Sequence, residues 1–482
     1  MMRYCRRCLY PENHPFGISF DAEGICTGCR VHEEKDRLDW VEREKKLAAL
    51  LASYRGRNRA RHDCVVPVSG GRDSFFIVHL LRKVYGLNPL LVTYNRHYNS
   101  RAGIFNQAHL RTVLGTDIHT LTLDPRQVKR VMRTTLDRIG SFHWHALAGQ
   151  TVFPVQTAVR AGIPLVIWGA HQALDQVGMF SHLDEVEMSR RYRREHDLMG
   201  LEAEDLVDEG ELSAIDLEPF FYPQDADIRR VGLRGIYLGN YIRWDTKAQH
   251  EKMVKLYDYY MGPLARTFDT YNDVDDLHYA GAHDLIKMAK LGYGKATDHA
   301  CREIRFGRLT RAEGAHLTAQ YERAPAGDLS RLAAFMQISE SDILAAADRF
   351  RDPRIWEKTP GGWQRKDDAA QSIADVARSL RESGTGFDDR PNIAAFVGSA
   401  ADGLDLLANG IRERSFAEIY AEAETFARER PVAVGIGAAL AGFFLARFIK
   451  SSADELAATH HEQISARANA ARSGINAPTH RV

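Results

Sequence analysis

The sequence has no excess of charge of either sign. Among its 482 residues, 64 lysines and arginines balance 64 aspartates and glutamates, so the formal net charge is zero at pH 7. A dedicated nucleic-acid binder needs a basic surface, and nucleic acid is therefore not an expected partner. Hydrophobic residues make up 44% of the chain and charged residues 27%, which is typical of a soluble globular protein of about two to four domains.

Further absences bear on where in the cell the protein lies and on which types of nucleotide site it can have. No apolar segment follows Met1, so we expect a cytoplasmic protein with no secretion signal and no disulfides. No G-x4-G-K-[ST] pattern occurs, since Gly294-Lys295 is followed by Ala296, and G-x-G-x-x-G is also missing. A Walker loop and a dinucleotide fingerprint are thereby excluded.

Only six cysteines are present, and four of them form two C-x2-C pairs. Seventeen residues lie between the pair Cys5 and Cys8 and the pair Cys26 and Cys29. This spacing is typical of a structural zinc site, in which four thiolates close a tetrahedron and leave no position open for chemistry. An iron–sulfur cluster and four unligated thiols remain as alternatives, because four thiolates also suit iron.

Short apolar runs alternate with helical patterns from residue 64 onward. This alternation predicts an α/β fold with a parallel, doubly wound, Rossmann-like sheet that binds ligands at the carboxyl ends of its strands. Before the sheet we expect one solvated helix, later an insertion, and then a helical, basic region. The expected strands are 64–68, 89–94, 118–123 and 164–168, the helices 33–55, 73–85, 101–114 and 147–160, the insertion 183–230 and the basic region 278–322.

The turn between the first strand and the next helix reads Ser69-Gly70-Gly71-Arg72-Asp73-Ser74. We expect both glycines to adopt backbone angles closed to other residues, so that N–H groups and the helix N-terminus point at one anion. The hydroxyls of Ser69 and Ser74 add donors, and Asp73 suits a magnesium ion. The turn therefore predicts an ATP site. The alternative is a capped helix with no ligand.

This turn resembles the loop of the PP-loop ATPases. The resemblance implies a fold of that type, ATP and Mg²⁺ as cofactors, and transfer of AMP to a substrate oxygen with release of pyrophosphate. An amide oxygen is a poor leaving group, and adenylation makes it a good one before a nitrogen or sulfur nucleophile attacks. Asp73 and Ser74 are then catalytic, and Ser69, Gly70, Gly71 and Arg72 bind the nucleotide.

Further stretches resemble the N-acetyl sugar amidotransferases of bacterial O-antigen and nonulosonic-acid biosynthesis. They are YCRRC and GICTGCR near the start, VIWGAHQ (166–172), GIYLGNYIRWD (235–245) and HDLIKMAKLGYGKATDHACREIRFGRLTRAEG (283–314). The resemblance implies that ATP and ammonia convert an N-acetyl group of a surface sugar to an acetamidino group. It covers roughly residues 1–366. We expect a zinc module (1–32), a PP-loop domain (33–366) and a helical tail (367–482), because the Pro/Gly-marked stretch 358–362 is followed by polar, Ala-rich helical sequence.

One of these stretches departs from the family. An acidic residue usually follows the Trp-Gly of the fourth strand, whereas Gly169 is followed here by Ala170 and His171. We assign Gly169 to the nucleotide site and His171 to catalysis, as a base or an orienting group, against a structural role. His143 and His145 lack a third ligand in spacing, so we interpret them as part of an ordinary loop rather than as a metal site.

The stretch 283–314 concentrates charge at helical spacing. Lys295, Asp298 and Arg302 fall on one helix face, as do Arg305 and Arg308. With the family resemblance we assign Lys295, Asp298 and Arg302 to nucleotide or substrate binding. The alternative is a solvated, salt-bridged helix face.

No pattern in the sequence indicates a glutaminase domain that would supply the nitrogen. An N-terminal nucleophilic cysteine would have to follow Met1, where Met2 stands, and neither Cys64 nor Cys301 has the flanking glycines of a cysteine elbow. A separate glutaminase subunit is therefore the expected partner. Two alternatives to the amidotransferase are a tRNA-modifying PP-loop enzyme, of thiolation or lysidine type, and a nucleotide-binding regulator.

One long apolar run lies near the end of the chain, within residues 431–449. As a helix its fifteen uninterrupted apolar residues span about 23 Å, which is short of a hydrocarbon core of about 30 Å. Flanking basic residues on both sides do not orient it. We expect attachment to the inner membrane, with a soluble helical hairpin as the alternative.

Overall fold

The computed structural model describes residues 2–56, 61–97, 99–208, 211–270 and 279–366, and the single residues 398, 401, 402 and 404. By contacts the chain divides into one unit, Met2–Arg365, and a second formed by Met1 and Lys366–Val482. The architecture below is that of Met2–Arg365. The apolar segment 431–449 lies outside the described residues. Within the described part, no helix is long and apolar enough to cross a membrane.

Five parallel strands form the central sheet. They are β1 (Cys64–Pro67), β2 (Pro89–Tyr94), β3 (Asp117–Leu121), β4 (Leu165–Trp168) and β5 (Arg234–Tyr237). Their order across the sheet is β3-β2-β1-β4-β5, with Val65 opposite both Leu90 and Val166. The chain thus winds outward in both directions from the pair β1 and β4. The predicted doubly wound parallel fold is confirmed, and its switch point lies at the carboxyl ends of these two strands.

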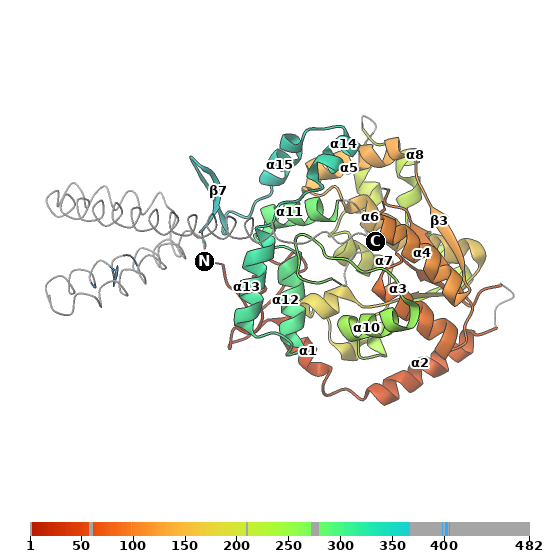
Figure 1. Ribbon diagram of the computed structural model, residues 1–482. Helices are drawn as coiled ribbons and strands as arrows, with labels where there is room; N and C mark the ends of the chain where they lie inside the picture. The colour runs from red at the N-terminus through yellow and green to blue at the C-terminus, as the bar shows by residue number, and fades with distance from the viewer. Residues whose placement is uncertain are drawn as a thin grey trace, which may run out of the picture. The chain divides into compact units, whose positions relative to one another are not determined.

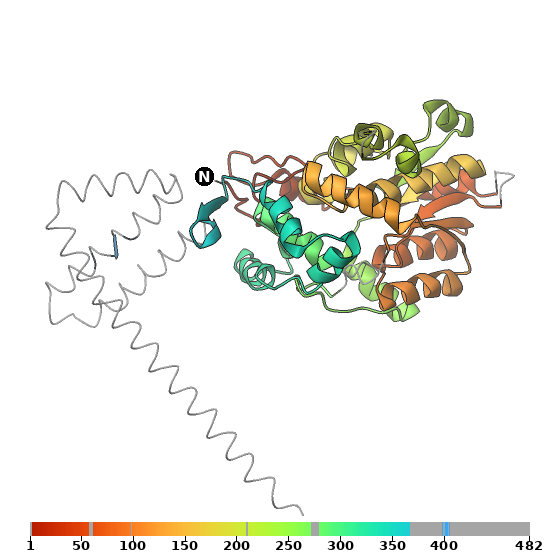
Figure 2. The same ribbon diagram turned by 90° about the horizontal axis from the view of Figure 1, so that it is seen from above.

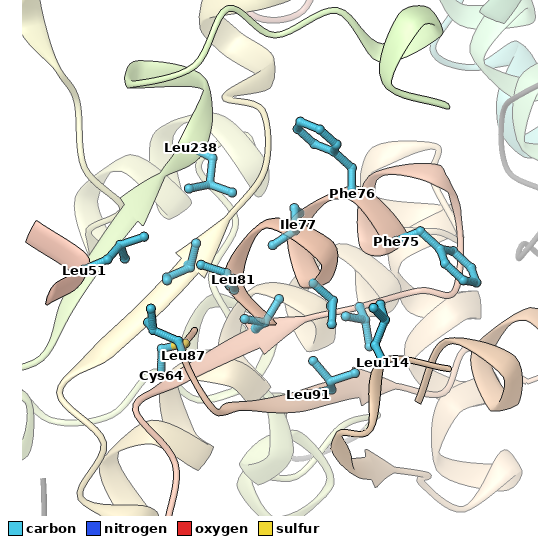
Figure 3. Close-up of a cluster of buried hydrophobic side chains, with 14 of the residues drawn as sticks. Leu51, Cys64, Phe75, Phe76, Ile77, Leu81, Leu87, Leu91, Leu114 and Leu238 are labelled. Atoms are coloured by element: carbon cyan, nitrogen blue, oxygen red, sulfur yellow. The ribbon is translucent and has the colours of Figure 1, made fainter. Parts of the chain in front are cut away.

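Helices cover both faces of the sheet. On one face α6 (Trp144–Ala161) packs against β1, β2 and β4. The opposite face carries α2 (Trp40–Tyr54), α3 (Arg72–His79) with its π-helical continuation η1 (Leu80–Val84), α4 (Arg101–Leu114) and α10 (Thr246–Tyr257). Figure 3 shows the hydrophobic core between the sheet and the helices of this opposite face, in which Phe75, Ile77 and Leu81 pack beside Leu91 and Leu114. These side chains are buried.

A run of short helices joins β4 to β5. It forms the insertion predicted over 183–230, and its apolar side chains pack against α6, as in the cluster of Leu206, Leu212, Leu217 and Phe220 with Trp144. The short helices are η2 (Ala173–Val177), η3 (His182–Asp184), α7 (Arg190–Tyr192), η4 (Arg193–Asp197), η5 (Ala203–Leu206), α8 (Ala214–Leu217), η6 (Glu218–Phe220) and α9 (Asp225–Val231). The three-residue helix η7 (Leu238–Asn240) follows β5 directly.

The last part of the unit is helical and ends in a hairpin. Figures 1 and 2 show α12 and α13 beside the N-terminal segment, on the side away from β3. A separate core joins α5 (Pro125–Ile139) to α11, α14 and α15 through residues such as Met132, Ile286 and Met336. The elements are α11 (Ala280–Leu291), α12 (Lys295–Arg305), α13 (Arg311–Glu322), α14 (Leu329–Met336), α15 (Glu340–Asp348), β6 (Trp356–Thr359) and β7 (Gly362–Arg365).

The single helix predicted over 33–55 is wrong. The structure has α1 (Thr27–Glu34) and α2, which are separate because Asp39 caps α2 by accepting a hydrogen bond from the Glu42 N–H at 3.0 Å. Between the helices Lys35 is buried and donates to Asp175 Oδ1 at 2.7 Å. Leu47 and Leu51 are also fully buried, so α2 packs one face on the core while most of its other residues face solvent.

Candidate functional site

The glycine turn lies at the switch point of the sheet. It leaves the end of β1 and enters α3, whose first residue is Arg72. The Ser74 hydroxyl accepts a hydrogen bond from the Ser69 N–H at 3.0 Å, and the Ser69 hydroxyl lies 3.4 Å from it. Ser74 is 4% exposed. Its hydroxyl therefore fixes the loop, while the loop backbone and the α3 N-terminus face the space above the strands.

The two glycines differ in conformation. Gly70 has a φ of +89°, and a Cβ built there would lie 3.0 Å from the backbone nitrogen of Gln107. Gly71 has φ −84° and ψ −174°, which is extended backbone that other residues adopt. The expectation that both glycines need forbidden angles is therefore correct for Gly70 and wrong for Gly71.

Two cavities open at this edge of the sheet. The smaller, about 220 Å³, is lined by Ser69, Asp73, Ser74 and Gly169, among residues from β1, β2, α6 and β4. The larger, about 490 Å³, is lined by Gly71, Arg72 and Asp73 of the same turn. Its other walls come from the N-terminal module, the β4–η2 turn, α11 and α12. The turn thus borders both spaces.

The larger cavity is basic. Seven lysines and arginines and four aspartates line it, which favours an anionic ligand. The basic residues are Lys35, Arg72, Arg96, Lys287, Lys295, Arg302 and Arg305, and the acidic ones Asp73, Asp175, Asp284 and Asp298.

Lys295, Asp298 and Arg302 all lie on the wall that α12 contributes, as their spacing predicted. Burial, with the charges of Arg72 and Arg96, outweighs Asp298 and lowers the pKa of Lys295 to about 8. Asp298 accepts hydrogen bonds from Tyr10 Oη at 3.1 Å and from the Lys287 ammonium. These residues form a packed cavity wall rather than a solvated helix face.

Arg305 and Arg308 do not share a helix face as predicted, because α12 ends at Arg305 and Arg308 lies in the turn that follows. Arg308 pairs with Glu303 and with Asp245 Oδ2 at 2.9 Å, and it does not line the cavity. Arg302 is held by Asp269 and by Glu303 Oε1 at 2.8 Å. Arg305 lines the cavity and extends toward the cysteines.

The four paired cysteines form one buried cluster. Their sulfur atoms all lie within 4.8 Å of one another, with Cys8 Sγ 3.7 Å from Cys26 Sγ and Cys5 Sγ 3.9 Å from Cys29 Sγ. A tetrahedron with metal–sulfur bonds of about 2.3 Å has edges of about 3.8 Å. A four-iron cluster binds each cysteine at a different iron and holds the sulfurs farther apart. The donor set therefore fits a single tetrahedral ion.

Arg305 connects this cluster to the cavity. Its Nη1 donates to the carbonyl oxygens of Asp175 and Gln176, both at 2.8 Å, and its Nη2 lies 3.5 Å from Cys26 Sγ. A Cβ on Gly28 would overlap this guanidinium, so the module approaches α12 closely. Tyr10 of the same module lines the cavity and bonds Asp298. The cysteine module is consequently one wall of the larger cavity.

His171 lies in neither cavity lining. Its side chain is buried among Tyr192, Tyr237 and Phe180, and its Nδ1 accepts a hydrogen bond from the Leu174 N–H at 3.2 Å. Burial lowers its pKa to about 4. The catalytic role predicted for His171 finds no support in this geometry, because the β4–η2 turn directs its ring into an aromatic core while Ala170 and Gln172 line the cavities.

His143 and His145 lie at the start of α6, not in a loop. His145 Nδ1 pairs with Tyr94 Oη at 3.0 Å, whereas His143 lines the larger cavity with its ring 4.4 Å from that of His283. Burial lowers the pKa of both residues of this second pair, that of His283 to about 4. Among the described residues only the four cysteines group as metal ligands.

Several lining residues were missed by the sequence analysis. Arg96 follows β2, Gln150 lies on α6, and Gln172 and Asp175 follow β4. For Arg96, Gln172 and Asp175 the available signal was their position after parallel strands, since such residues meet at one edge of the sheet. Burial raises the pKa of Asp175, but the bonded ammonium of Lys35 outweighs it and the pKa is lowered.

The α12 wall belongs to a segment with known relatives. Residues 265–369 match the family model described as the C-terminal domain of WbpG-like lipopolysaccharide-biosynthesis proteins. The chain resembles WbpG in this domain. The match confirms the resemblance to an O-antigen biosynthesis family that the sequence predicted. The WbpG-like segment contains α11 and α12 and supplies Lys287, Lys295, Asp298, Arg302 and Arg305 to the larger cavity.

Other comparisons are more distant. Over 120 residues the chain is 23% identical to MJ1599, an uncharacterized protein of Methanocaldococcus jannaschii. The matched stretch covers 25% of this chain and 43% of that protein. A Francisella tularensis NMN synthetase matches 47% of this chain and 99% of its own, at 16% identity and TM-score 0.24. The NH3-dependent NAD synthetase of Campylobacter jejuni matches 63% of this chain and 98% of its own, at 12% identity and TM-score 0.26. The U34-tRNA thiolase NcsA of Methanococcus maripaludis matches 70% of this chain and 96% of its own, at 11% identity and TM-score 0.21.

Proposed function

We propose that this protein is an ATP-dependent amidotransferase that converts the N-acetyl group of a bacterial surface-glycan sugar to an acetamidino group. The observation that carries the proposal is the position of the Ser69–Ser74 turn, which borders a small cavity at the sheet edge and a basic one walled by the WbpG-like segment. ATP occupies the smaller cavity with its phosphates on the turn, and the sugar occupies the larger.

The first step is adenylation. The amide oxygen of the N-acetyl group attacks the α-phosphorus of ATP, the bond to the bridging oxygen breaks, and pyrophosphate leaves. The N–H groups of the turn and the α3 N-terminus stabilise the charge on the departing phosphates. Ser74 keeps the turn in shape through its bond to the Ser69 N–H.

Asp73 fits a magnesium ligand. It lines both cavities, its side chain is 40% exposed, and a carboxylate is the oxygen donor that Mg²⁺ prefers. An ion held there would neutralise charge on the pyrophosphate. On the opposite wall Lys295 and Arg302 hold the anionic part of a ligand, and Asp298 orients Lys287.

The second step replaces the adenylated oxygen. Ammonia attacks the imidate carbon, loses a proton, and AMP leaves with the former amide oxygen. Ammonium cannot attack, so a separate glutaminase subunit supplies NH3. Neither remaining cysteine is suited to that task, because Cys64 lies fully buried in the sheet core and Cys301 fully buried beside the cysteine cluster.

The cysteine module holds structural zinc in this proposal. Four thiolates fill the tetrahedron, so the ion has no position open for substrate. Its role is to hold Arg305 and Tyr10 in the wall of the larger cavity.

Product analysis with labelled ATP tests the proposal. With ammonia and a panel of N-acetylated sugars, free and nucleotide-linked, we expect AMP and pyrophosphate in equal amounts. Asp73→Asn should lower turnover about 10²-fold while the metal content of the cysteine site stays unchanged. ADP as the product, or full turnover by Asp73→Asn, would contradict it.

A further inference from the structure

The two cavities share a boundary. Six residues line both of them, namely Ser69, Asp73, Arg96, Gln150, Ala170 and Gln172. On the proposed function, one cavity holds ATP and the other the sugar. The α-phosphorus and the attacking amide oxygen must then meet at this boundary, because a bond forms between them.

Only one of the six shared residues carries a positive charge. Ser69 and Asp73 belong to the turn, Ala170 has no polar side chain, and Gln150 is a neutral amide on α6. Arg96 comes from the loop after β2, on the opposite side of β1 from the β4 turn. It is a half-buried guanidinium between the two spaces.

The electrostatic reach of Arg96 supports this placement. Burial is the largest cause of the lowered pKa values of His143, His283 and Lys295, and the charge of Arg96 contributes to the lowering in all three. His143 and His283 come from α6 and α11, and Lys295 begins α12. One cation thus acts on the walls of the larger cavity from a position that also lines the smaller one.

We propose that Arg96 is a catalytic residue of the adenylation step, which binds the α-phosphate and stabilises its transition state. As the amide oxygen bonds to the α-phosphorus and the bond to pyrophosphate breaks, negative charge grows on the equatorial phosphate oxygens. A planar guanidinium can donate hydrogen bonds to two such oxygens at once. Its position at the boundary lets it contact this group without occupying the pyrophosphate nest of the Ser69–Ser74 turn.

Exchange of labelled pyrophosphate into ATP, measured with the N-acetylated acceptor but without ammonia, isolates the adenylation step. We expect Arg96→Ala to lower the exchange rate constant by about 10³-fold and to weaken ATP binding by less than about tenfold. Arg96→Lys keeps the charge but loses the fork, so it should lose about 10-fold to 10²-fold. Arg101→Ala is the matched control, because Arg101 is exposed at the start of α4 and lines neither cavity.

The outcomes separate this inference from the proposed function. If the native protein produces no AMP and pyrophosphate with any acceptor, the proposed function fails. If the native protein turns over and a folded Arg96→Lys or Arg96→Ala exchanges pyrophosphate as fast, the inference alone fails. A loss that appears entirely in the ATP dissociation constant would also overturn it. Metal content and the thermal midpoint establish folding of each variant, and Arg96→Lys decides the question if Arg96→Ala does not fold.

Discussion

The Ser69–Ser74 turn and the α12 wall face the same cavity but are built in different ways. The turn uses backbone N–H groups, two short hydroxyls and one left-handed glycine, all within six consecutive residues. The α12 wall uses long charged side chains, each held by residues distant in sequence, such as Tyr10 on Asp298 and Asp269 on Arg302.

Because of this difference, the two regions can recognise different features of a ligand. A backbone nest binds phosphate of any nucleotide, because its donors belong to the main chain. Side-chain forks held by carboxylates can distinguish one anionic ligand from another, because each donor has a defined direction. We infer that the turn provides the chemistry common to ATP and that the WbpG-like segment provides specificity for the acceptor.

Damage to the turn should have the largest effect. Gly70→Val places a β-branched side chain at φ +89° and directs its Cβ at the Gln107 backbone. We expect AMP formation to fall by about 10³-fold. The matched variant is Gly71→Ala, whose extended backbone accepts a Cβ, and which should lose far less. Equal losses in the two variants, measured as initial rates, would show that the left-handed glycine is not what shapes the nest.

Loss of the metal should come next and should fall on the other wall. Cys26→Ser removes one of four thiolates and the contact of Arg305 with its sulfur. We expect metal content to drop, the thermal midpoint to fall by roughly 10 °C, and turnover to fall mainly through a raised KM for the acceptor.

The control for this substitution is Cys64→Ala, a buried cysteine of the sheet core. It should cost stability through lost packing but leave one metal ion per chain. Elemental analysis of both variants measures the difference. Full metal content in Cys26→Ser, or stoichiometric iron in the native protein, would contradict the zinc assignment.

A smaller, pH-dependent effect should belong to α12 alone. Lys295 has a pKa of about 8, so its ammonium is charged below that pH and neutral above it. Binding of an anionic ligand should therefore weaken as pH rises through about 8, by up to about tenfold per pH unit. Lys295→Arg should remove this fall, because a guanidinium stays charged. A pH profile of kcat/KM that is identical in both proteins would show that Lys295 does not contact the ligand.

The smallest effect should follow removal of the chain beyond residue 369, where the WbpG-like segment ends. All residues assigned to the cavities precede it, and Met2–Arg365 is one compact unit. We expect unchanged AMP formation. Fractionation with membranes before and after truncation tests the separate expectation for segment 431–449. A folded but inactive truncation would place part of the site in the tail.

Much of the sheet was predictable because its signals are local. The predicted strand 89–94 and helix 101–114 coincide with β2 and α4, since a run of β-branched and apolar residues or a repeating apolar face needs no distant partner to be seen. Strand β5 was not predicted as a strand. It is only four residues long and is defined by its pairing with β4.

The site shows the same division. The turn and the cysteine pairs were predicted from their own residues, because their geometry follows from spacing within a few positions. The assignments that the structure does not support concern residues whose surroundings come from distant parts of the sequence. His171 was assigned to catalysis, yet Tyr192 and Tyr237 surround it, and the helix predicted over 33–55 is interrupted where Lys35 meets Asp175.

The sequence alone therefore indicated the doubly wound sheet, the glycine turn after β1 and the two cysteine pairs, since the signal for each lies within a short stretch of residues even where the contacts are between distant ones. Only the tertiary structure decided that Arg96 lies between the two cavities, and that Arg305 joins the cysteine module to the α12 wall. The physical reason is that a long charged side chain has no preferred partner in its own segment. Its direction is chosen by the buried carboxylates, carbonyls and thiolates that folding brings to it.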